Sequence, residues 1–229
     1  MNEGGKLSVV GTPIGNLEDI TLRALRTLKE ADVIYCEDTR VTRKLLNRYE
    51  ITTPTRRLDA NTEMVGAKEV INRLTTGERV AYCTDAGTPC ISDPGYRLVA
   101  AVRQALGDSF PIEAIPGPSA VATALSIAGL PADSFRFMGF LPHKKGRHTL
   151  LKEIAAEEGT VVLYESSHRI LKLLGELAAL LEGREVTVVR EVTKKFEEVQ
   201  IGTAAGLKEF FEEYPDHTRG EFVLIIGDC

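Results

Sequence analysis

Three groups of polar residues directly follow apolar, strand-like runs, and each group places a carboxylate near a cation. The groups are Cys36-Glu37-Asp38-Thr39-Arg40, Tyr164-Glu165-Ser166-Ser167-His168-Arg169 and Arg190-Glu191-Val192-Thr193-Lys194. Carboxylates and histidines often move protons in catalysis, and His168 is the only histidine in such a setting. Ion pairs and helix caps are the alternative interpretation, because Thr39 and Ser167 are natural N-caps. Since the pattern occurs three times, we favour a polar cleft over three separate caps.

Three loops rich in glycine and proline also follow strand-like runs, and they span residues 11–21, 84–95 and 116–120. The first loop lacks the Lys-Ser/Thr ending of a P-loop, and its glycines do not fit G-x-G-x-x-G. Loops that follow parallel strands gather at one edge of the sheet, where α/β proteins bind ligands. The sequence therefore predicts a ligand site at this edge.

Several polar residues of these loops have competing interpretations. Asp85 suits ligand contact and turn support equally well. Asp93 is best explained as the N-cap of the helix that follows it, and Ser119 either caps a helix or faces a ligand. Asp19 or Thr21 is expected to cap the helix after the first loop.

The cysteines and histidines indicate no metal site. Cys36, Cys83, Cys90 and Cys229 form no C-x-x-C pair and have no zinc-finger spacing to a histidine. Cys36 and Cys83 end apolar runs, which predicts buried thiols without disulfides, as in a reducing cytosol. No G-x-S-x-G nucleophile elbow is present, and we assign no role to the histidines at 143, 148 and 217.

Apolar strand-like runs alternate with helical patterns along almost the whole chain. Strands are predicted at 7–10, 33–36, 79–83, 112–115, 136–141, 161–164, 186–189, 198–201 and 222–226. Helices are predicted at 20–30, 39–49, 62–76, 95–106, 118–128, 146–157, 167–182 and 203–213. The predicted fold class is α/β, with a mostly parallel sheet in the N-terminal half and a mixed sheet in the C-terminal half. Proline and glycine at 116–118 predict a joint between the halves, 1–115 and 119–229.

The predicted helix 39–49 has a basic face. Arg40, Arg43, Lys44 and Arg48 fall within an arc of about 140°, because an α-helix has about 3.6 residues per turn. A solvated helix face is the simpler interpretation for a single helix. No acidic residue lies on this face to neutralise it, which leaves anion binding open.

Composition limits the classes of function. The chain has 229 residues, of which 43% are hydrophobic, so it can bury a sizeable core. The formal net charge of −5 argues against a generally nucleic-acid-binding surface but allows a local basic groove. No run approaches the roughly 18 apolar residues of a membrane span. The polar start at residues 1–6 shows no signal peptide, so a cytoplasmic protein is expected.

Seven motifs in a fixed order carry a family resemblance that extends over residues 7–228. They are GTPIGNLEDIT, CEDTR, TDAGTPCISDPG, PGPSA, FMGFLP, YESSHR and RE-x-TK. With these motifs the chain resembles the bacterial small-subunit ribosomal RNA cytidine-2′-O-methyltransferases of the tetrapyrrole methylase superfamily. The resemblance implies two α/β domains with S-adenosylmethionine in the cleft between them, and a homodimer. Longer members carry a further C-terminal segment, so this chain is either a short member or part of a longer protein.

The resemblance also implies which residues form the cofactor cleft. They are Pro13, Gly15, Asp85, Gly87, Thr88, Pro89, Ile91, Ser119 and Ala120, joined less strongly by Tyr164 and Glu191. The implied reaction is in-line transfer of a methyl group to a ribose 2′-hydroxyl, which needs a base near that hydroxyl.

The candidate bases are Glu37, Asp38, Glu165, His168, Glu191 and Lys194. We favour the groups 165–169 and 190–194, because they are expected to flank the cleft from the second domain. RNA phosphates are expected to contact the basic face of helix 39–49 and a second basic patch formed by Lys144, Lys145 and Arg147.

Three alternatives remain open. A methyltransferase of the same fold that acts on a tetrapyrrole or corrin ring would need an aromatic-lined trough, whereas this chain has 6% aromatic residues and no Trp. A cofactor-binding, RNA-associated protein without activity is disfavoured by the strand-end carboxylates. A nucleotide-dependent oxidoreductase is disfavoured by the absence of G-x-G-x-x-G.

Overall fold

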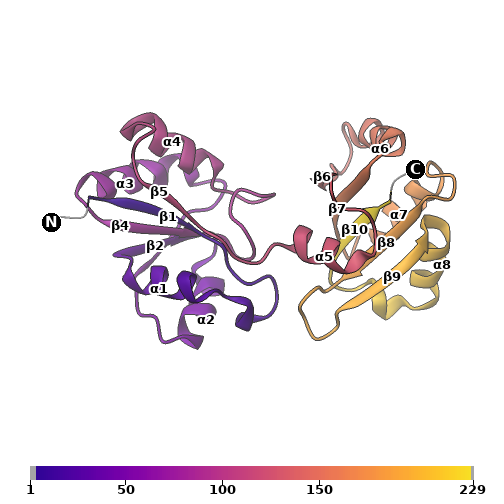
Figure 1. Ribbon diagram of the computed structural model, residues 1–229, viewed down its shortest axis with the longest axis horizontal. Coiled ribbons are helices and arrows are strands. Elements are labelled where there is room, and N and C mark those ends of the chain that lie inside the picture. Colours follow the sequence, from indigo (N-terminus) through magenta and orange to yellow (C-terminus); the bar gives the residue numbers. More distant parts are fainter. Residues whose placement is uncertain (1–3, 228–229) are drawn as a thin grey trace. The chain divides into compact units, whose positions relative to one another are not determined.

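The computed structural model describes residues 4–227 and divides into two compact units, Met1–Ser119 and Ala120–Cys229. Each unit has its own sheet and is described by itself (Figure 1). The first residues of the predicted polar start, 1–3, and Cys229 lie outside the described residues. Within residues 4–227, every helix is too short or too polar to traverse a bilayer. The predicted domain limits, 1–115 and 119–229, stay a prediction.

The first unit is built on a five-stranded parallel sheet with the order β3-β2-β4-β1-β5. Its elements are β1 (Lys6–Val10), the short 3-10 helix η1 (Leu17–Asp19), α1 (Leu22–Glu30), β2 (Val33–Cys36), α2 (Thr39–Arg48), β3 (Thr55–Arg57), α3 (Glu63–Thr75), β4 (Arg79–Cys83), α4 (Tyr96–Leu106) and β5 (Ile112–Ile115). The predicted parallel sheet is confirmed. Strand β3 was not predicted, because its Thr-Arg-Arg sequence has no apolar residue and lies at the edge of the sheet.

Helices cover both faces of this sheet (Figure 1). Residues of α1 and α2 form one hydrophobic cluster with Ile34 and Cys36, and residues of α3 and α4 form another with Val33 and Tyr35. These four residues are consecutive in β2, and successive side chains of a strand point to opposite faces. A strand buried on both faces is therefore apolar at every position, which explains the uninterrupted apolar run.

The second unit is built on a five-stranded mixed sheet with the order β6-β7-β10-β8-β9. Its elements are α5 (Ala120–Ala128), β6 (Phe135–Phe140), α6 (Arg147–Ala156), β7 (Thr160–Ser166), α7 (Ile170–Ala178), β8 (Glu185–Arg190), β9 (Glu198–Thr203), α8 (Ala204–Glu213), the 3-10 helix η2 (Pro215–Thr218) and β10 (Glu221–Ile226). Only β6 and β7 pair in parallel, and β10 pairs antiparallel with both β7 and β8. The predicted mixed sheet is confirmed.

The core of the second unit lies on the sheet face that α6, α7 and α8 cover. Leu151, Leu174 and Phe211 represent the three helices in one cluster, which also contains residues of β7, β8 and β10. Helix α5 packs on β8 and β10, and the hydroxyl of Thr187 donates to the carbonyl of Ala128 at 3.3 Å. Helices therefore pack on both faces of this sheet, as the hydrophobic periodicity of its strands and helices indicates.

The first two helices begin at short polar side chains. Thr21 caps α1, because its hydroxyl accepts a hydrogen bond from the backbone N–H of Ala24 at 3.1 Å, as predicted. Asp38 caps α2 by accepting from the N–H of Arg40 at 2.8 Å. The predicted cap Thr39 is therefore wrong by one residue, since it is already the first residue of the helix.

A long-range carboxylate caps α4. The buried Glu63 of α3 accepts from the backbone N–H groups of Gly95 at 2.9 Å and Leu98 at 3.0 Å. The prediction that Asp93 caps this helix is wrong, because Glu63 satisfies the donors from across the fold. The prediction for Ser167 is also wrong, since α7 begins only after this turn and without a side-chain cap.

Candidate active site

The three glycine- and proline-rich loops meet at one edge of the first unit's sheet. β4, β1 and β5 are neighbours and run parallel, so the loops that follow them leave from the same edge. The chain after β1 continues into α1 on one face, and the chain after β4 continues into α4 on the other. Connections that leave adjacent strands toward opposite faces open a crevice, which is the usual ligand position in a doubly wound sheet.

Hydrogen bonds hold these loops together. Thr12 and Gly87 exchange two backbone hydrogen bonds of 2.9 and 3.1 Å, which form an isolated antiparallel bridge. The hydroxyl of Thr12 donates to the carbonyl of Thr84 at 3.2 Å. The hydroxyl of Thr88 donates to the carbonyl of Pro118 at 3.4 Å. The loops are therefore fixed to one another by the protein itself.

A close backbone contact joins the first loop to the third. A Cβ atom on Gly117 would lie 2.9 Å from the carbonyl oxygen of Gly11, and a Cβ atom on Gly11 would lie 2.8 Å from the nitrogen of Gly117. Both separations are shorter than a real Cβ contact allows. Glycine is required at both positions because the two backbones touch.

Most of the predicted cofactor residues lie at this edge of the first unit. Those in its three loops are Pro13, Gly15, Asp85, Gly87, Thr88, Pro89, Ile91 and Ser119. Gly15 and Ile91 are exposed, whereas Pro13, Gly87 and Pro89 are buried. The structure does not group Ala120 and Tyr164 with them, because these residues belong to α5 and β7 of the second unit.

A cavity of about 110 Å³ lies beside the first loop. It is lined by Thr12, Pro13, Leu17, Val41, Thr42, Lys44, Leu45, Thr84 and Asp85. Helix α2 forms part of the wall, which sequence reasoning missed because no local signal places this helix against the first loop. Pro13 and Asp85 are the predicted cofactor residues in this wall.

Three carboxylates at this edge have raised pKa values. Burial raises the pKa of Glu37, and the negative charges of Asp85 and Asp93 raise it further. Burial also raises the pKa of Asp85 and of Asp93, although hydrogen bonds from Asp38 N–H and from Thr84 oppose the respective shifts. Within residues 4–227, none of the three forms an ion pair with lysine or arginine. Such carboxylates are better proton acceptors than ordinary ones and leave negative charge available to a cation.

Asp38 is a carboxylate of another kind. Besides capping α2, it forms an ion pair with Arg40 at 2.6 Å. Hydrogen bonds from Arg40 hold the pKa of Asp38 far below its ordinary value. This pairing makes Asp38 a weaker proton acceptor, so its assignment as a candidate base stays a prediction that the pairing disfavours. The pairing also compensates the charge of Arg40.

The basic face of α2 is narrower than predicted. Arg43, Lys44 and Arg48 are exposed and form no ion pair with a carboxylate in the described part of the chain. The guanidinium of Arg48 lies 5.8 Å from the centre of the Tyr49 ring. The unneutralised face therefore consists of Arg43, Lys44 and Arg48, without Arg40.

In the second unit, Glu165 is enclosed. It is 1% exposed, and its Oε1 accepts from the N–H of Ser166 at 2.8 Å and lies 3.4 Å from Nε of Arg169. Arg169 in turn donates to the carbonyl of Leu141 at 2.5 Å. A carboxylate enclosed in this way is not exposed to a substrate hydroxyl in this structure, and the assignment of Glu165 as a base stays a prediction.

The neighbours of Glu165 have different surroundings. The ring of Tyr164 is half-buried, and its centre lies 5.0 Å from that of Phe137 and 5.4 Å from that of Phe140. His168 is exposed in the turn between β7 and α7. His168 therefore keeps the accessibility that a candidate base needs.

Glu191 and Lys194 form an ion pair that also includes Glu221. Nζ of Lys194 lies 2.8 Å from Oε1 of Glu191 and 2.8 Å from Oε2 of Glu221. Burial lowers the pKa of Lys194, but its hydrogen bonds to the two carboxylates outweigh burial and raise it. Burial raises the pKa of Glu191, but hydrogen bonds from Lys194 and from Glu221 N–H outweigh burial and lower it. A protonated ammonium and a weakly basic carboxylate argue against this group as the base, although its assignment stays a prediction.

Strained backbone is concentrated in two of the predicted site loops. Cys90 and Ser92 have φ values of 73° and 60°, and Glu191 and Thr193 have φ values of 49° and 67°. A Cβ atom on Gly220 would lie 2.5 Å from Cγ of Glu191, so the glycine makes room for this side chain. Non-glycine residues in the left-handed region cluster at functional sites, which supports a role for both loops.

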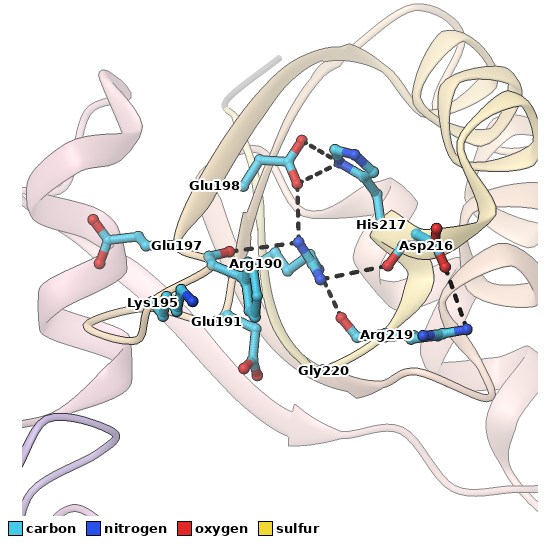
Figure 2. A pocket seen from close by; sticks show the side chains of 10 residues that line it. Arg190, Glu191, Lys195, Glu197, Glu198, Asp216, His217, Arg219 and Gly220 are labelled. Atoms are coloured by element: carbon cyan, nitrogen blue, oxygen red, sulfur yellow. Dashed lines mark hydrogen bonds and ion pairs between the residues drawn. The ribbon is translucent and has the colours of Figure 1, made fainter.

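Figure 2 shows a pocket of about 620 Å³ beside the loop that joins β8 to β9. Arg190 lies at its centre and donates to the carbonyl of Arg219 at 2.6 Å and to the carboxylate of Glu198 at 3.3 Å. It also donates to the carbonyls of Phe196 and Asp216, both at 3.5 Å. Arg190 thus fixes the loop, β9 and η2 to one another.

Glu198 is the carboxylate on which this pocket is organised. Nδ1 of His217 lies 2.8 Å from one of its oxygens. Burial raises the pKa of Glu198, but hydrogen bonds from Gln200, His217 and Arg190 outweigh burial and lower it. Sequence reasoning missed Glu198 and His217, because η2 reaches β9 only through the long return along α8.

The second predicted basic patch is divided. Lys144 and Lys145 are exposed in the loop before α6, as a surface patch requires. Arg147 is only 5% exposed, and its Nη2 lies 2.6 Å from the carboxylate of Glu176. Burial and this ion pair disfavour Arg147 as an RNA contact, and that assignment stays a prediction.

The cysteine thiols are free in the described residues. Cys36 and Cys83 are buried, as predicted, and burial raises the pKa of each thiol. Cys90 is half-buried and also free. Among residues 4–227, no cluster of three or more histidine, cysteine, aspartate or glutamate side chains could hold a metal ion.

Sequence comparison relates the chain to methyltransferases. A profile of the family described as Tetrapyrrole (Corrin/Porphyrin) Methylases matches residues 6–208. The chain is 43% identical over 223 residues to Ribosomal RNA small subunit methyltransferase I of Thermotoga maritima, an alignment that covers 97% of this chain and 98% of that protein. It is 47% identical over 222 residues to the protein of the same name from Vibrio cholerae, which covers 96% of this chain and 76% of that protein.

Solved structures share the fold. A crystal structure of cobalt precorrin-4 methyltransferase, a cobalamin biosynthetic enzyme, aligns with a TM-score of 0.71 at 21% identity and covers 97% of this chain and 94% of that one. A crystal structure of diphthine synthase aligns with a TM-score of 0.74 at 16% identity and covers 97% and 89%. At these identities the likeness shows the fold alone.

Proposed function

Because the chain belongs to the tetrapyrrole methylase family, we propose that it is an enzyme that methylates the ribose 2′-hydroxyl of a cytidine in small-subunit ribosomal RNA, with S-adenosylmethionine as donor. The observation that carries this proposal is the similarity to ribosomal RNA methyltransferases along nearly the whole chain. The convergent loops of the first unit, with their unpaired carboxylates, support a site for a positively charged ligand.

The residues at the edge of the first sheet fit the methyl donor. When bound, S-adenosylmethionine supplies an electrophilic methyl group on a sulfonium. The half-buried carboxylates Glu37, Asp85 and Asp93 offer negative charge to the sulfonium and ammonium groups, because no lysine or arginine of the described chain pairs with them. The donor would be held by the three loops that Thr12 and Gly87 join. Ala120 and Tyr164 remain predicted contacts from the second unit.

We assign the base to Glu37 in preference to Glu165 and Glu191 of the second unit. The hydroxyl is a poor nucleophile and has to lose its proton near the transition state. Glu37 is the carboxylate whose pKa is raised by burial and by two neighbouring negative charges, so it holds a proton more tightly than an ordinary carboxylate. Glu191 has the opposite shift, and Glu165 is enclosed.

The remaining catalytic contribution is positioning. Holding nucleophile and electrophile in line is worth roughly 7–11 kcal/mol. Arg43, Lys44 and Arg48 would hold RNA phosphates from the first unit, since their charges are not compensated within the described chain. Phosphate contacts position the RNA, and the choice of nucleotide requires contacts to a base.

A methylation assay tests the proposal. The protein is incubated with labelled S-adenosylmethionine and either purified small-subunit ribosomal RNA or assembled small subunits, and the label is mapped. We expect label on one cytidine ribose. A tetrapyrrole acceptor is assayed in parallel, because the superfamily includes enzymes for such rings. Label on the ring alone, on a nucleobase, or on no RNA would overturn the proposal.

Two further properties follow from the proposed function. The enzyme would act in the cytoplasm, where ribosomal subunits are found. It would also act as the homodimer that the family resemblance implies, which a mass measurement in solution can test. A monomeric mass at working concentration would overturn the dimer and leave the proposed reaction intact.

A further inference from the structure

We infer that a cavity between α6 and α7 of the second unit binds a backbone phosphate of the RNA, an inference that rests on the proposed function. The cavity has a volume of about 480 Å³. This is within the range of roughly 300–1,000 Å³ that is typical of ligand pockets, so it admits a phosphate together with an adjoining sugar.

The hydrogen-bond donors at the rim of the cavity come from three segments. His143 and Lys144 lie in the loop after β6, His148 lies in the first turn of α6, and Lys172 lies in α7. Lys144 is exposed and has no carboxylate partner among the described residues, and the side chain of Lys172 is 63% exposed. Each imidazole offers at least one N–H donor whether or not it is protonated. The rim therefore presents several donors to an anion.

The floor of the cavity is a buried ion pair. Nε and Nη2 of Arg147 donate to Oε2 of Glu176 at 2.9 and 2.6 Å, and Nη1 donates to the carbonyl of Pro142 at 3.3 Å. Glu176 is the only carboxylate residue in the lining, and Lys172 approaches its other oxygen only to 4.0 Å. Arg147 thus compensates the negative charge of the cavity and ties the loop after β6 to α7. It is a positioning residue, and the charges of Lys144 and Lys172 remain for a ligand.

The sign of this charge stands out in an acidic protein. The chain carries a formal net charge of −5, yet this cavity gathers three cationic residues and two histidines around one carboxylate. The pocket around Arg190 is lined by four carboxylate residues against three cationic residues and one histidine, so its positive charges are outnumbered. An RNA phosphate therefore matches the cavity between α6 and α7 and not the pocket around Arg190.

The test compares two charge-reversal variants of the full chain. In Lys144→Glu/Lys172→Glu we expect RNA affinity to fall about tenfold and the slope of log K against log salt to shrink by about 0.7–0.9, the change for one lost phosphate contact. Lys208→Glu is the control, because Lys208 is a half-exposed lysine of the same unit that pairs with Glu212 at 2.7 Å. Its salt slope should stay that of the wild type.

A second measurement uses inorganic phosphate as the probe. Titration of the wild type should shift the ring resonances of His143 and His148 saturably, and Lys144→Glu/Lys172→Glu should abolish the saturation. If the wild type methylates RNA but the double variant keeps its salt slope, the phosphate assignment is overturned and the proposed function stands. If the wild type neither binds nor methylates RNA, the proposed function fails, whatever phosphate does. Absence of saturable phosphate shifts in the wild type also overturns this inference.

Discussion

Two groups of carboxylates are held in opposite ways, one at the loop edge of the first unit and the other around the loop that joins β8 to β9 in the second. In the first unit, Glu37, Asp85 and Asp93 lie near one another, form no ion pair with lysine or arginine in the described chain, and have raised pKa values. In the second unit, Glu191 and Glu198 are paired with cations and have lowered pKa values. The difference separates carboxylates that are available to a ligand from carboxylates that shape a loop.

This contrast also distinguishes the way in which the loops are fixed. The first unit joins its loops through backbone hydrogen bonds between Thr12 and Gly87 and through the hydroxyls of Thr12 and Thr88, so its charged side chains are not used to hold the loops together. The second unit joins its loops through side chains, with Arg190 hydrogen-bonded to three segments (Figure 2). We therefore expect the first unit to supply the reacting groups and the second to supply rigid walls.

The largest effect is expected for Glu37→Gln. Removal of a general base should lower methyl transfer at saturating donor by about 10²–10⁴-fold. The wild-type rate should rise with pH through the raised pKa of Glu37, and the variant should lose this limb. The rate of methyl transfer is measured under single-turnover conditions, and donor affinity is measured by calorimetry.

Glu191→Gln is the matched control for Glu37→Gln in the second unit. Because the pKa of Glu191 is lowered by its partners, we expect its turnover to change by less than about tenfold. A larger loss in Glu191→Gln than in Glu37→Gln would reverse the comparison between the units.

The next largest effect is on stability. Gly117→Ala places a Cβ atom 2.9 Å from the Gly11 backbone, so we expect the free energy of unfolding to fall by about 2 kcal/mol, the middle of the range for overpacking. Gly159→Ala is the control, since a Cβ atom there meets nothing within 4 Å. Urea unfolding measures both. Equal stabilities would show that the loops of the first unit are not joined by backbone contact.

RNA affinity should depend on the uncompensated cations of α2. Arg43→Glu/Lys44→Glu should weaken RNA binding about tenfold and reduce the salt slope by about 1.4–1.8. Arg40→Gln should have a smaller effect, because Asp38 already compensates Arg40. RNA affinity and its salt dependence are measured by filter binding at several salt concentrations. A wild-type slope in the double variant would return this helix to an ordinary solvated face.

The smallest expected effects are changes in the free energy of unfolding. They test whether the pKa shifts of Asp93 and Glu198 have opposite signs. Asp93 has a raised folded pKa, so the folded state binds protons more tightly there and loses stability as pH rises through that pKa. Asp93→Asn should therefore stabilise the protein at pH 7 by roughly 0.5 kcal/mol.

Glu198 has the opposite sign. Its lowered folded pKa contributes stability above the unfolded pKa of about 4.3, and this contribution is lost as pH falls through the folded pKa. Glu198→Gln should therefore destabilise the protein at pH 7 by roughly 1 kcal/mol, the typical scale for one substitution. Thermal unfolding of both variants at pH 7 is the measurement, and shifts of the same sign would remove the contrast between the units.

The sheets could be predicted because each buried strand is apolar along its length. β2 is buried at every position, and its Val-Ile-Tyr-Cys run can be recognised in the sequence. β3 could not be recognised in the sequence, because an edge strand of threonine and arginine buries little apolar surface. The predictions of helix caps failed where the capping residue is distant in sequence. An example is Glu63, which accepts hydrogen bonds from the N–H groups of Gly95 and Leu98.

The sequence predicted that three loops meet at one edge of the sheet. It did not predict which carboxylates there would have raised pKa values. Parallel strand order alone brings the loops after β1, β4 and β5 to one edge. The protonation behaviour of a carboxylate depends on neighbours that are distant in sequence, such as Glu221 beside Lys194 and Asp85 beside Glu37. The sequence alone therefore favours a base in the second unit, whereas the structure favours Glu37 in the first.

The contact between Gly11 and Gly117 links two positions in the evolution of the chain. Each would place its Cβ atom against the backbone of the other, so a substitution at one position cannot be relieved by a smaller side chain at the other. No compensating pair exists, because glycine is already the smallest residue. We therefore expect both positions to stay glycine as relatives diverge, with no co-variation to reveal that they touch.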